Sequence, residues 1–215
     1  MFANTEVKDL FPTPLWIVDL VPAKRDALNR HLMKAIEALM TPRTPQPIGV
    51  PWQTEPTLHN RPEFAEFCDL ARSASKGALD FLGVRHDGFE ITGCWANVHP
   101  AGTVNSSHHH PNNYLSGVYY VAVPEGTGKI EFIDPRPRAN MIQPPVQRFN
   151  KYVGDRIILD VHEGRFVLFP AWLNHAVPMN RSNGERVSIA FNIMFRQFTE
   201  NMTRPLWAGA ANVKV

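Results

Sequence analysis

Three histidines in two separate stretches of the chain have the spacing of a metal site. His108 and His110 lie just before a β-like run of residues. Because alternate residues of a strand face the same side, these two imidazoles can converge on one point while His109 points away. A divalent metal is the usual reason for two neutral imidazoles to lie so close together. His175 follows another apolar run far downstream, which is consistent with a third ligand on a strand of a facing sheet.

A cationic residue downstream of these histidines could bind a carboxylate. Arg186 begins the β-like run of residues 186–195, and Ser188 follows two residues later. On a strand both side chains would face the same side, so a guanidinium and a hydroxyl could hold one carboxylate between them. A buried arginine without an anionic partner would be costly. Ser188 could equally hydrogen-bond within the sheet, so Arg186 carries this prediction.

The elements that position these residues are short β-rich runs in the second half of the chain. Alternating apolar and polar residues, bounded by turn residues, predict strands over residues 89–98, 115–123, 129–133, 156–159, 165–169 and 186–195. Helical spacing of apolar residues predicts two helices ahead of them, over residues 22–40 and 62–83. Prolines favour an edge strand over residues 10–19 and extended loops over residues 41–56 and 135–145.

These elements together predict a mainly β fold with N-terminal helices (α+β). Strands that follow a helical start favour a two-sheet jelly roll with the helices packed on one sheet. A chain of 215 residues with 44% hydrophobic residues has room for a single domain, residues 1–215. Within it we expect N-terminal support from residues 1–83, a β core over residues 84–198 and a C-terminal tail over residues 199–215. The N-terminal edge strand could support a homodimer.

Charge and hydropathy narrow the choice of partners. The net charge is +2 at pH 7 and the basic residues are scattered, so we expect no nucleic acid and no acidic membrane as partner. No apolar stretch approaches the roughly 20 residues needed to cross a bilayer. Residues 1–9 lack a secretory signal, and Cys68 and Cys94 are too few for a disulfide framework. We therefore expect a cytoplasmic protein with a small-molecule partner.

The order of the motifs resembles a known enzyme family. His-x-His-Pro is followed by Leu-Ser-Gly-Val-Tyr-Tyr, Phe-x-Asp-Pro-Arg, Phe-Pro-x-Trp-Leu-x-His and Arg-x-Ser-Ile-Ala-Phe-Asn. In this order, over residues 95–195, they resemble the 2-oxoglutarate-dependent iron(II) oxygenases of bacteria and phages, distant relatives of prolyl hydroxylases. The resemblance implies a double-stranded β-helix, a cupin-like jelly roll, with Fe(II) and 2-oxoglutarate at one mouth. It also implies a dioxygenase that couples oxidative decarboxylation of 2-oxoglutarate to hydroxylation of a substrate by O₂.

The resemblance assigns roles to individual positions of this sequence. By their matching positions, His108 and His110 would be the first pair of metal ligands and His175 the distal histidine. Arg186 would bind the distal carboxylate of 2-oxoglutarate with Ser188 as its partner. Tyr120 lies where related enzymes place a tyrosine on the same carboxylate, although it could also simply pack within the sheet.

One departure from the wider superfamily affects the metal. Its usual triad has a carboxylate two residues after the first histidine, where this chain has His110. Three neutral ligands would leave Fe(II) its full charge and should raise its redox potential. Asp134 is the reserve carboxylate, which could ligate the metal or orient a histidine. We favour an orienting or loop role, because Asp-Pro-Arg is also typical of a turn after a strand.

Other functions fit the same residues. The protein could be a three-histidine cupin dioxygenase that binds its substrate directly and needs no 2-oxoglutarate, or a non-catalytic β-barrel that binds a metal or another ligand. Trp95 and Asn97 share a strand face, where Asn97 could touch substrate or metal-bound water, but a core tryptophan and a turn asparagine explain them equally well. The substrate could be a small molecule or a peptide, and the sequence does not identify it.

Overall fold

The computed structural model describes residues 2–136 and 145–201 of the chain. The C-terminal tail expected over residues 199–215 therefore lies mostly outside the described residues. So does the middle of the proline-rich loop expected over residues 135–145. Among the described residues, none of the helices combines the length and apolar character that a bilayer-spanning segment needs.

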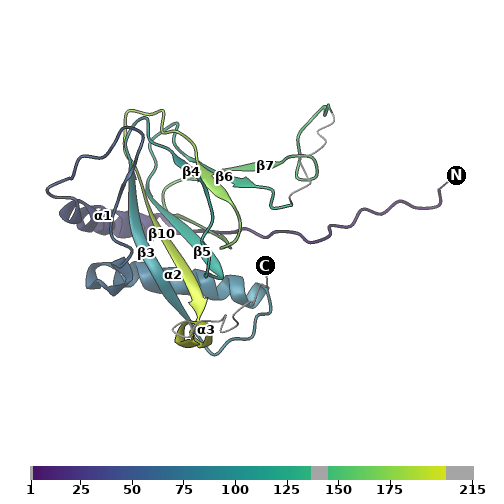
Figure 1. Ribbon diagram of the computed structural model, residues 1–215, viewed down its shortest axis with the longest axis horizontal. Helices are drawn as coiled ribbons and strands as arrows, with labels where there is room; N and C mark the ends of the chain where they lie inside the picture. The colour runs from purple at the N-terminus through teal and green to yellow at the C-terminus, as the bar shows by residue number, and fades with distance from the viewer. Residues whose placement is uncertain (1, 137–144, 202–215) are drawn as a thin grey trace, which may run out of the picture.

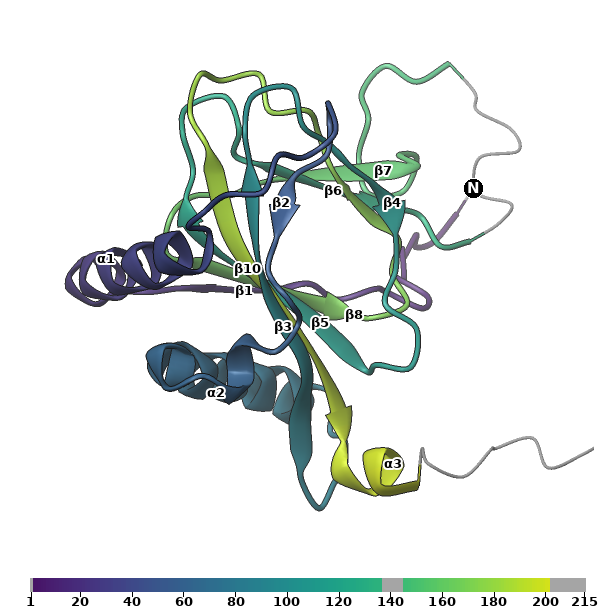
Figure 2. The same cartoon turned by 60° about the vertical axis from the view of Figure 1, so that its left-hand side comes forward.

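Two antiparallel sheets form the body of the molecule (Figures 1 and 2). The six-stranded sheet has the order β1-β8-β5-β10-β3-β2, and the four-stranded sheet has the order β4-β9-β6-β7. Their bounds are β1 Trp16–Asp19, β2 Trp52–Gln53, β3 Phe89–His99, β4 Asn105–His108, β5 Leu115–Ala122, β6 Lys129–Ile133, β7 Arg156–Asp160, β8 Arg165–Pro170, β9 His175–Val177 and β10 Arg186–Phe195. The predicted jelly roll with N-terminal helices is confirmed.

Two long helices cover the outer face of the six-stranded sheet (Figure 2). They are α1, Pro22–Leu39, and α2, Ala65–Phe81, and two short 3-10 turns over Leu58–Asn60 and Pro62–Phe64 lie between them. Their apolar faces are buried against the sheet, as the spacing of those residues predicts. Gly83 follows α2 with φ +63, a left-handed conformation that ends a helix at little cost for glycine. A short third helix, α3 (Arg196–Asn201), follows β10.

Alternation along β5 separates the two faces of the six-stranded sheet. Tyr119 faces the helices, where its hydroxyl donates to Asn29 Oδ1 at 2.5 Å, and Asn29 Nδ2 donates to the Val121 carbonyl at 2.7 Å. Tyr120 faces the other way, into a smaller apolar cluster between the two sheets with Val167 and Phe169. The helices therefore hold the outer face of the sheet while its inner face is left for the space between the sheets.

Three short strands lie outside the strand ranges predicted from the sequence. Residues 41–56 were predicted as an extended loop, but β2 within them pairs with β3 and adds a sixth strand to the sheet. β4 and β9 pair with each other in the four-stranded sheet. β4 is polar and β9 has only three residues, so neither has the apolar alternation by which a strand is recognised. These strands depend on their partners in the sheet for their stability.

Candidate metal and co-substrate site

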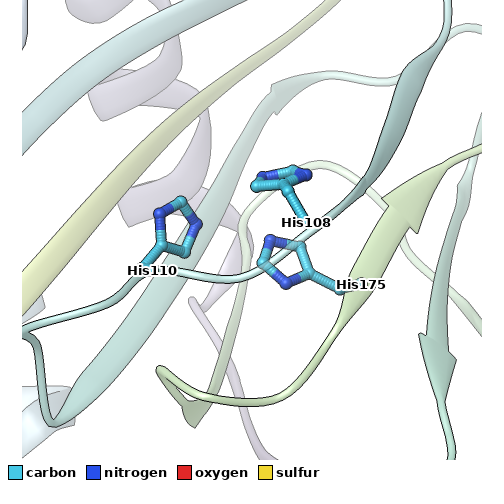
Figure 3. A group of neighbouring side chains, drawn as sticks. All are labelled: His108, His110 and His175. Atoms are coloured by element: carbon cyan, nitrogen blue, oxygen red, sulfur yellow. The ribbon is translucent and has the colours of Figure 1, made fainter. Parts of the chain in front are cut away.

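The three candidate histidines lie together between the sheets. One nitrogen from each of His108, His110 and His175 lies within 4.8 Å of the others, and no aspartate, glutamate or cysteine of the described residues joins this group. The ring centroids are 4.3 Å apart for His108 and His175 and 5.1 Å for each of the other pairs. Figure 3 shows the three rings turned toward one another. His109, between the first two, is exposed.

The route by which these rings meet differs from the sequence-based prediction. We expected His108 and His110 to alternate on one strand, but β4 ends at His108 and His110 lies in the loop that follows. That loop is held by the His110 amide, which donates to the Ala171 carbonyl at 2.9 Å. We also expected His175 on a facing sheet, whereas it lies directly opposite His108 on the neighbouring strand β9. Cross-strand pairing brings these two rings together because opposite residues of neighbouring strands share a face.

Hydrogen bonds fix which nitrogen of two rings can bind a metal. His108 Nδ1 lies 2.7 Å from the Ser106 carbonyl oxygen, and His175 Nδ1 lies 3.0 Å from the Leu173 carbonyl oxygen. A carbonyl oxygen only accepts, so each Nδ1 carries the proton and each Nε2 keeps a free lone pair. Backbone carbonyls commonly orient metal-binding histidines in this way. Both rings can therefore bind a metal ion through the lone pair of Nε2.

Burial keeps two of the rings neutral. It lowers the pKa of His175 to about 3, with a smaller contribution from the neighbouring histidines. It also lowers the pKa of His110 to about 4, again with smaller contributions from His108 and His109. At pH 7 both imidazoles are neutral, which is the state that binds a metal ion. The donor set of three neutral imidazoles fits a divalent transition metal.

Arg186 provides a buried positive charge in the same cavity. Its side chain is 2% exposed, and Nη1 donates to the carbonyls of Lys129, at 2.8 Å, and Thr127, at 3.3 Å. Its Nε has no hydrogen-bond partner, and no carboxylate of residues 2–136 or 145–201 forms an ion pair with it. Burial lowers the pKa of this guanidinium, although an arginine stays charged at neutral pH. A buried cation without a protein carboxylate beside it is costly, and a bound anion would remove that cost.

Tyr120 completes this anion cradle. It is fully buried, and its ring lies under the guanidinium with 5.0 Å between the ring centroid and Arg186 Cζ. Its hydroxyl is close enough to accept from Arg186, but among the described residues it donates to no acceptor. Burial raises the pKa of Tyr120, so the phenol stays protonated and can donate. Ser188 lies opposite Tyr120 in the sheet and is also buried. The Tyr120 hydroxyl and Arg186 Nε are thus both free to donate to a carboxylate.

One cavity of about 280 Å³ connects the two groups. The three histidines line it together with Arg186, Tyr120 and Ser188. A volume of this order suits a small co-substrate better than a large ligand. The residues present therefore fit a metal ion and a small carboxylic acid held in one cavity.

Asp134 lies outside this cavity. It follows β6, and its carboxylate accepts from the backbone amide of Arg136 at 2.9 Å and forms an ion pair with the guanidinium of the same residue. This contact lowers the pKa of Asp134, which therefore stays ionised. The residue borders a larger cavity of about 990 Å³ that residues 8–15 form with β6, β7 and Trp172. The structure thus places Asp134 in a turn rather than among the metal-binding candidates.

Alternation on β3 adds three residues to the cavity wall. Trp95, Asn97 and His99 face inward, with the Trp95 ring centroid 5.6 Å from that of His110. Asn97 Oδ1 accepts from Gln53 Nε2 at 2.6 Å, so the unexpected strand β2 also reaches the cavity. His99 lies opposite Arg186 in the sheet, and burial with a smaller contribution from that charge lowers its pKa to about 4. The period of two along residues 95, 97 and 99 was the signal that could have identified His99.

The fold and these residues define a jelly-roll protein of the kind that holds a metal ion between its sheets. Residues 93–192, which include every residue of the metal and anion groups, match the model of a family described as "Putative 2OG-Fe(II) oxygenase". The match covers just under half of the chain and lies within the β core. The resemblance drawn from the motifs, and with it the prediction of an enzyme that uses Fe(II) and 2-oxoglutarate, is confirmed at the level of the family.

Solved structures share the fold at low sequence identity. The α-ketoglutarate-dependent carbocyclase SnoK of nogalamycin biosynthesis is 14% identical with a TM-score of 0.60, and the match covers 85% of this chain and 80% of SnoK. HygX from Streptomyces hygroscopicus, with nickel and 2-oxoglutarate bound, is 14% identical with a TM-score of 0.59 and coverages of 86% and 83%.

A prolyl-4-hydroxylase from Pseudomonas putida is 15% identical, with a TM-score of 0.56 and coverages of 86% and 94%. At these identities the likeness establishes the double-stranded β-helix fold and nothing finer. No curated protein matches the sequence.

Proposed function

We propose that this oxygenase binds Fe(II) through His108, His110 and His175 and 2-oxoglutarate through Arg186. The reaction would convert 2-oxoglutarate, O₂ and a C–H bond of the substrate into succinate, CO₂ and a hydroxylated product. The observation that carries the proposal is the pairing of a buried, unneutralised Arg186 with three convergent imidazoles in one cavity. HygX, which has this fold, was solved with 2-oxoglutarate and nickel and also with iron.

The residues of this chain would divide the work between binding and orientation. Arg186 supplies the charge for the distal carboxylate, and the Tyr120 hydroxyl and Ser188 add hydrogen bonds that fix its direction. The carbonyls of Ser106 and Leu173 hold two of the rings so that their Nε2 atoms stay aimed at one point. When bound, Fe(II) would supply the redox chemistry that couples the two oxidations.

Apolar residues form part of the cavity wall. Phe169 and Ile130 border the cavity and are buried, whereas His108 and His110 are only partly buried. Trp95 and the hydrogen-bonded pair of Gln53 and Asn97 line the same cavity on the β2–β3 side. We propose that this side receives the substrate, either a small molecule or a peptide. A prolyl hydroxylase of this fold was solved with a peptide fragment.

We place the reaction in the cytoplasm, in keeping with the free, buried thiols of Cys68 and Cys94.

A three-histidine dioxygenase that does not use 2-oxoglutarate is the second candidate. It is favoured by the absence of any carboxylate from the metal group within the described residues. In that case Arg186 would bind a carboxylate of the substrate itself. The two candidates differ in whether 2-oxoglutarate binds to the Fe(II)-loaded protein.

Succinate production tests the leading proposal. Protein purified without oxygen and loaded with Fe(II) is mixed with 2-oxoglutarate and then with air, and succinate is measured. We expect succinate from the parent protein and none above background from Arg186→Ala. Arg72→Ala, which removes an exposed arginine on α2, is the matched control and should behave as the parent does.

Anaerobic titration with 2-oxoglutarate separates the two candidates. Chelation of the metal by 2-oxoglutarate should produce a charge-transfer absorption band in the parent protein. A protein that binds Fe(II) but produces neither this band nor succinate would favour the second candidate over the first.

A further inference from the structure

The four-stranded sheet ends in an exposed strand. β7 pairs with β6 on one side only, and among the described residues no strand pairs with its other side. Figures 1 and 2 show β7 at the outer end of this sheet. Ile157 is 43% exposed and Ile158 is 55% exposed, although both lie in the middle of the strand. An edge strand with exposed apolar residues is a ready template for another strand.

The direction of the backbone groups in β7 sets which residues can pair outward. The Val161 amide donates to the Gly128 carbonyl, and the Asp134 amide donates to the Asp155 carbonyl, both across the β6–β7 pair. In an antiparallel pair the bonded residues alternate along each strand, so the odd-numbered residues of β7 face β6. The amides and carbonyls of Arg156, Ile158 and Asp160 therefore face away from the sheet.

The sequence of β7 is complementary to itself in reverse. It reads Arg156-Ile-Ile-Leu-Asp160, with a basic and an acidic residue at the ends and apolar residues between. If two copies pair antiparallel about Ile158, each Arg156 lies opposite Asp160 of the second copy, on the same face as Ile158. Opposite charges at facing positions stabilise antiparallel pairs, and the same register places only outward-facing backbone groups against each other. The charge pattern and the hydrogen-bonding pattern thus select the same register.

We propose that a second copy of this chain adds its β7 antiparallel to β7 across a two-fold axis, so that the two four-stranded sheets become one. A two-fold axis suits a self-complementary strand, because each contact is made twice. The Asp160 carbonyl also accepts from Arg165 Nη1 at 2.9 Å, and its second lone pair remains for the partner strand. Arg156 would lie between Glu131, whose carboxylate is 3.4 Å away, and Asp160 of the second copy.

Apolar residues beside the strand would enlarge the interface. Phe149, Tyr152 and Val153 precede β7 and are exposed. On the other face of β7, Ile157 would lie opposite Leu159 of the second copy in the same register. An interface of this size fits a dimer in equilibrium with the monomer, at a ratio that depends on protein concentration, rather than an obligate dimer.

The other sheet edges fit a second copy less well. β1, the edge that the sequence suggested, carries an acidic residue at one end and no basic residue at the other. β2 has only two residues, and β4 is polar and ends at His108. The dimer is therefore assigned to β7 instead of the N-terminal strand.

Charge reversal and charge exchange test this dimer. Sedimentation velocity of the full chain over a range of concentrations measures the dimer dissociation constant. Arg156→Asp and Asp160→Arg each place like charges opposite one another twice, and each should weaken the dimer by at least about ten-fold. The double variant Arg156→Asp/Asp160→Arg restores opposite charges and should return the dissociation constant to within about three-fold of the parent. Arg72→Asp, on the exposed face of α2, is the control for charge and should leave the dimer unchanged.

Mixing the two single variants gives a second test. A mixed dimer can form only if both variants are folded, so it shows that neither variant is monomeric because it is unfolded. Arg156→Asp mixed with Asp160→Arg has complementary charges at both pairs and should form a mixed dimer although each variant alone is monomeric. Circular dichroism should show the parent fold in every variant. A parent protein that stays monomeric at the highest concentration, a single reversal that leaves the dimer intact, or a double variant that stays monomeric would each overturn the proposal. Succinate production is measured separately and has no bearing on it.

Discussion

The two faces of the six-stranded sheet differ in how their buried polar groups are hydrogen-bonded. On the outer face the Tyr119 hydroxyl and the Asn29 side chain bond to each other and to the backbone of β5. On the inner face, Tyr120 is the next residue of β5 and its hydroxyl donates to no acceptor among the described residues. Arg186 Nε, on the neighbouring strand β10, is also buried without an acceptor. Folded proteins rarely leave buried polar groups unpaired. Ser75 Oγ on α2 is also unpaired, but the two atoms of the inner face lie together in one cavity with a charged group, which indicates a face built for a ligand. The outer face stabilises the fold, and the inner face is prepared for binding.

The largest effect should come from the metal ligands. His175→Ala removes one of three converging nitrogens, and we expect Fe(II) affinity to fall by more than about 100-fold. His109→Ala removes the exposed neighbour and should leave metal affinity unchanged. Anaerobic titration with Co(II), a divalent substitute for Fe(II), measures the metal affinity of both variants by absorption. Equal losses in the two variants would mean that the rings of His108, His110 and His175 do not form the site.

Arg186 should separate binding from stability. Arg186→Met keeps much of the side-chain volume without the charge, and we expect the dissociation constant for 2-oxoglutarate to rise by at least about 30-fold. The free energy of unfolding should be unchanged or higher, because an unneutralised charge no longer has to be buried. The charge-transfer band and urea denaturation measure the two quantities. A large loss of stability with unchanged binding would make Arg186 a structural residue of the inner face.

The adjacent tyrosines compare the two faces most directly. Tyr119→Phe leaves Asn29 Oδ1 buried without its donor, so we expect the free energy of unfolding to fall by about 1–3 kcal/mol and 2-oxoglutarate binding to be unchanged. Tyr120→Phe removes a hydroxyl that donates to no acceptor among the described residues, so the free energy of unfolding should change by less than it does in Tyr119→Phe. Its loss should weaken 2-oxoglutarate binding by about 3- to 10-fold. If the two substitutions have the same effects, the distinction between the faces is wrong.

The smallest effect should come from the exposed edge of the same sheet. Asp19 on β1 faces Arg165 on β8, which donates to it at 2.8 Å from both Nε and Nη2. This bond lowers the pKa of Asp19 below its ordinary value of 3.8. The pair therefore stabilises the fold above that pH, and its contribution is lost as the pH falls through the lowered pKa. Because Asp19 is largely exposed, Asp19→Asn should cost only about 0.5 kcal/mol at pH 7. The difference from the parent in urea denaturation should vanish once the pH falls below this lowered pKa.

Several long elements could be predicted from the sequence because local periodicity determines them. The bounds of β6 and β10 match the prediction, and those of β3, β5, β7 and β8 differ from it by one residue at one end. In the two long helices the apolar residues repeat at helical spacing, while β7 and β8 are short continuous apolar runs, so a short window contains the signal. The short strands β2, β4 and β9 contain no such signal. They are strands only because a neighbour across the sheet completes their hydrogen bonds.

The sequence by itself determined the types and order of the residues that could bind a metal and a carboxylate, since these are chemical properties that need no fold. Only the tertiary structure decided how the residues meet. His108 and His175 face each other on neighbouring strands, His110 reaches them from a loop, and Asp134 pairs with Arg136 instead. It also decided that Arg186 is buried with no described carboxylate beside it. Hydrogen-bond partners and burial depend on residues far apart in the chain, and no local pattern records them.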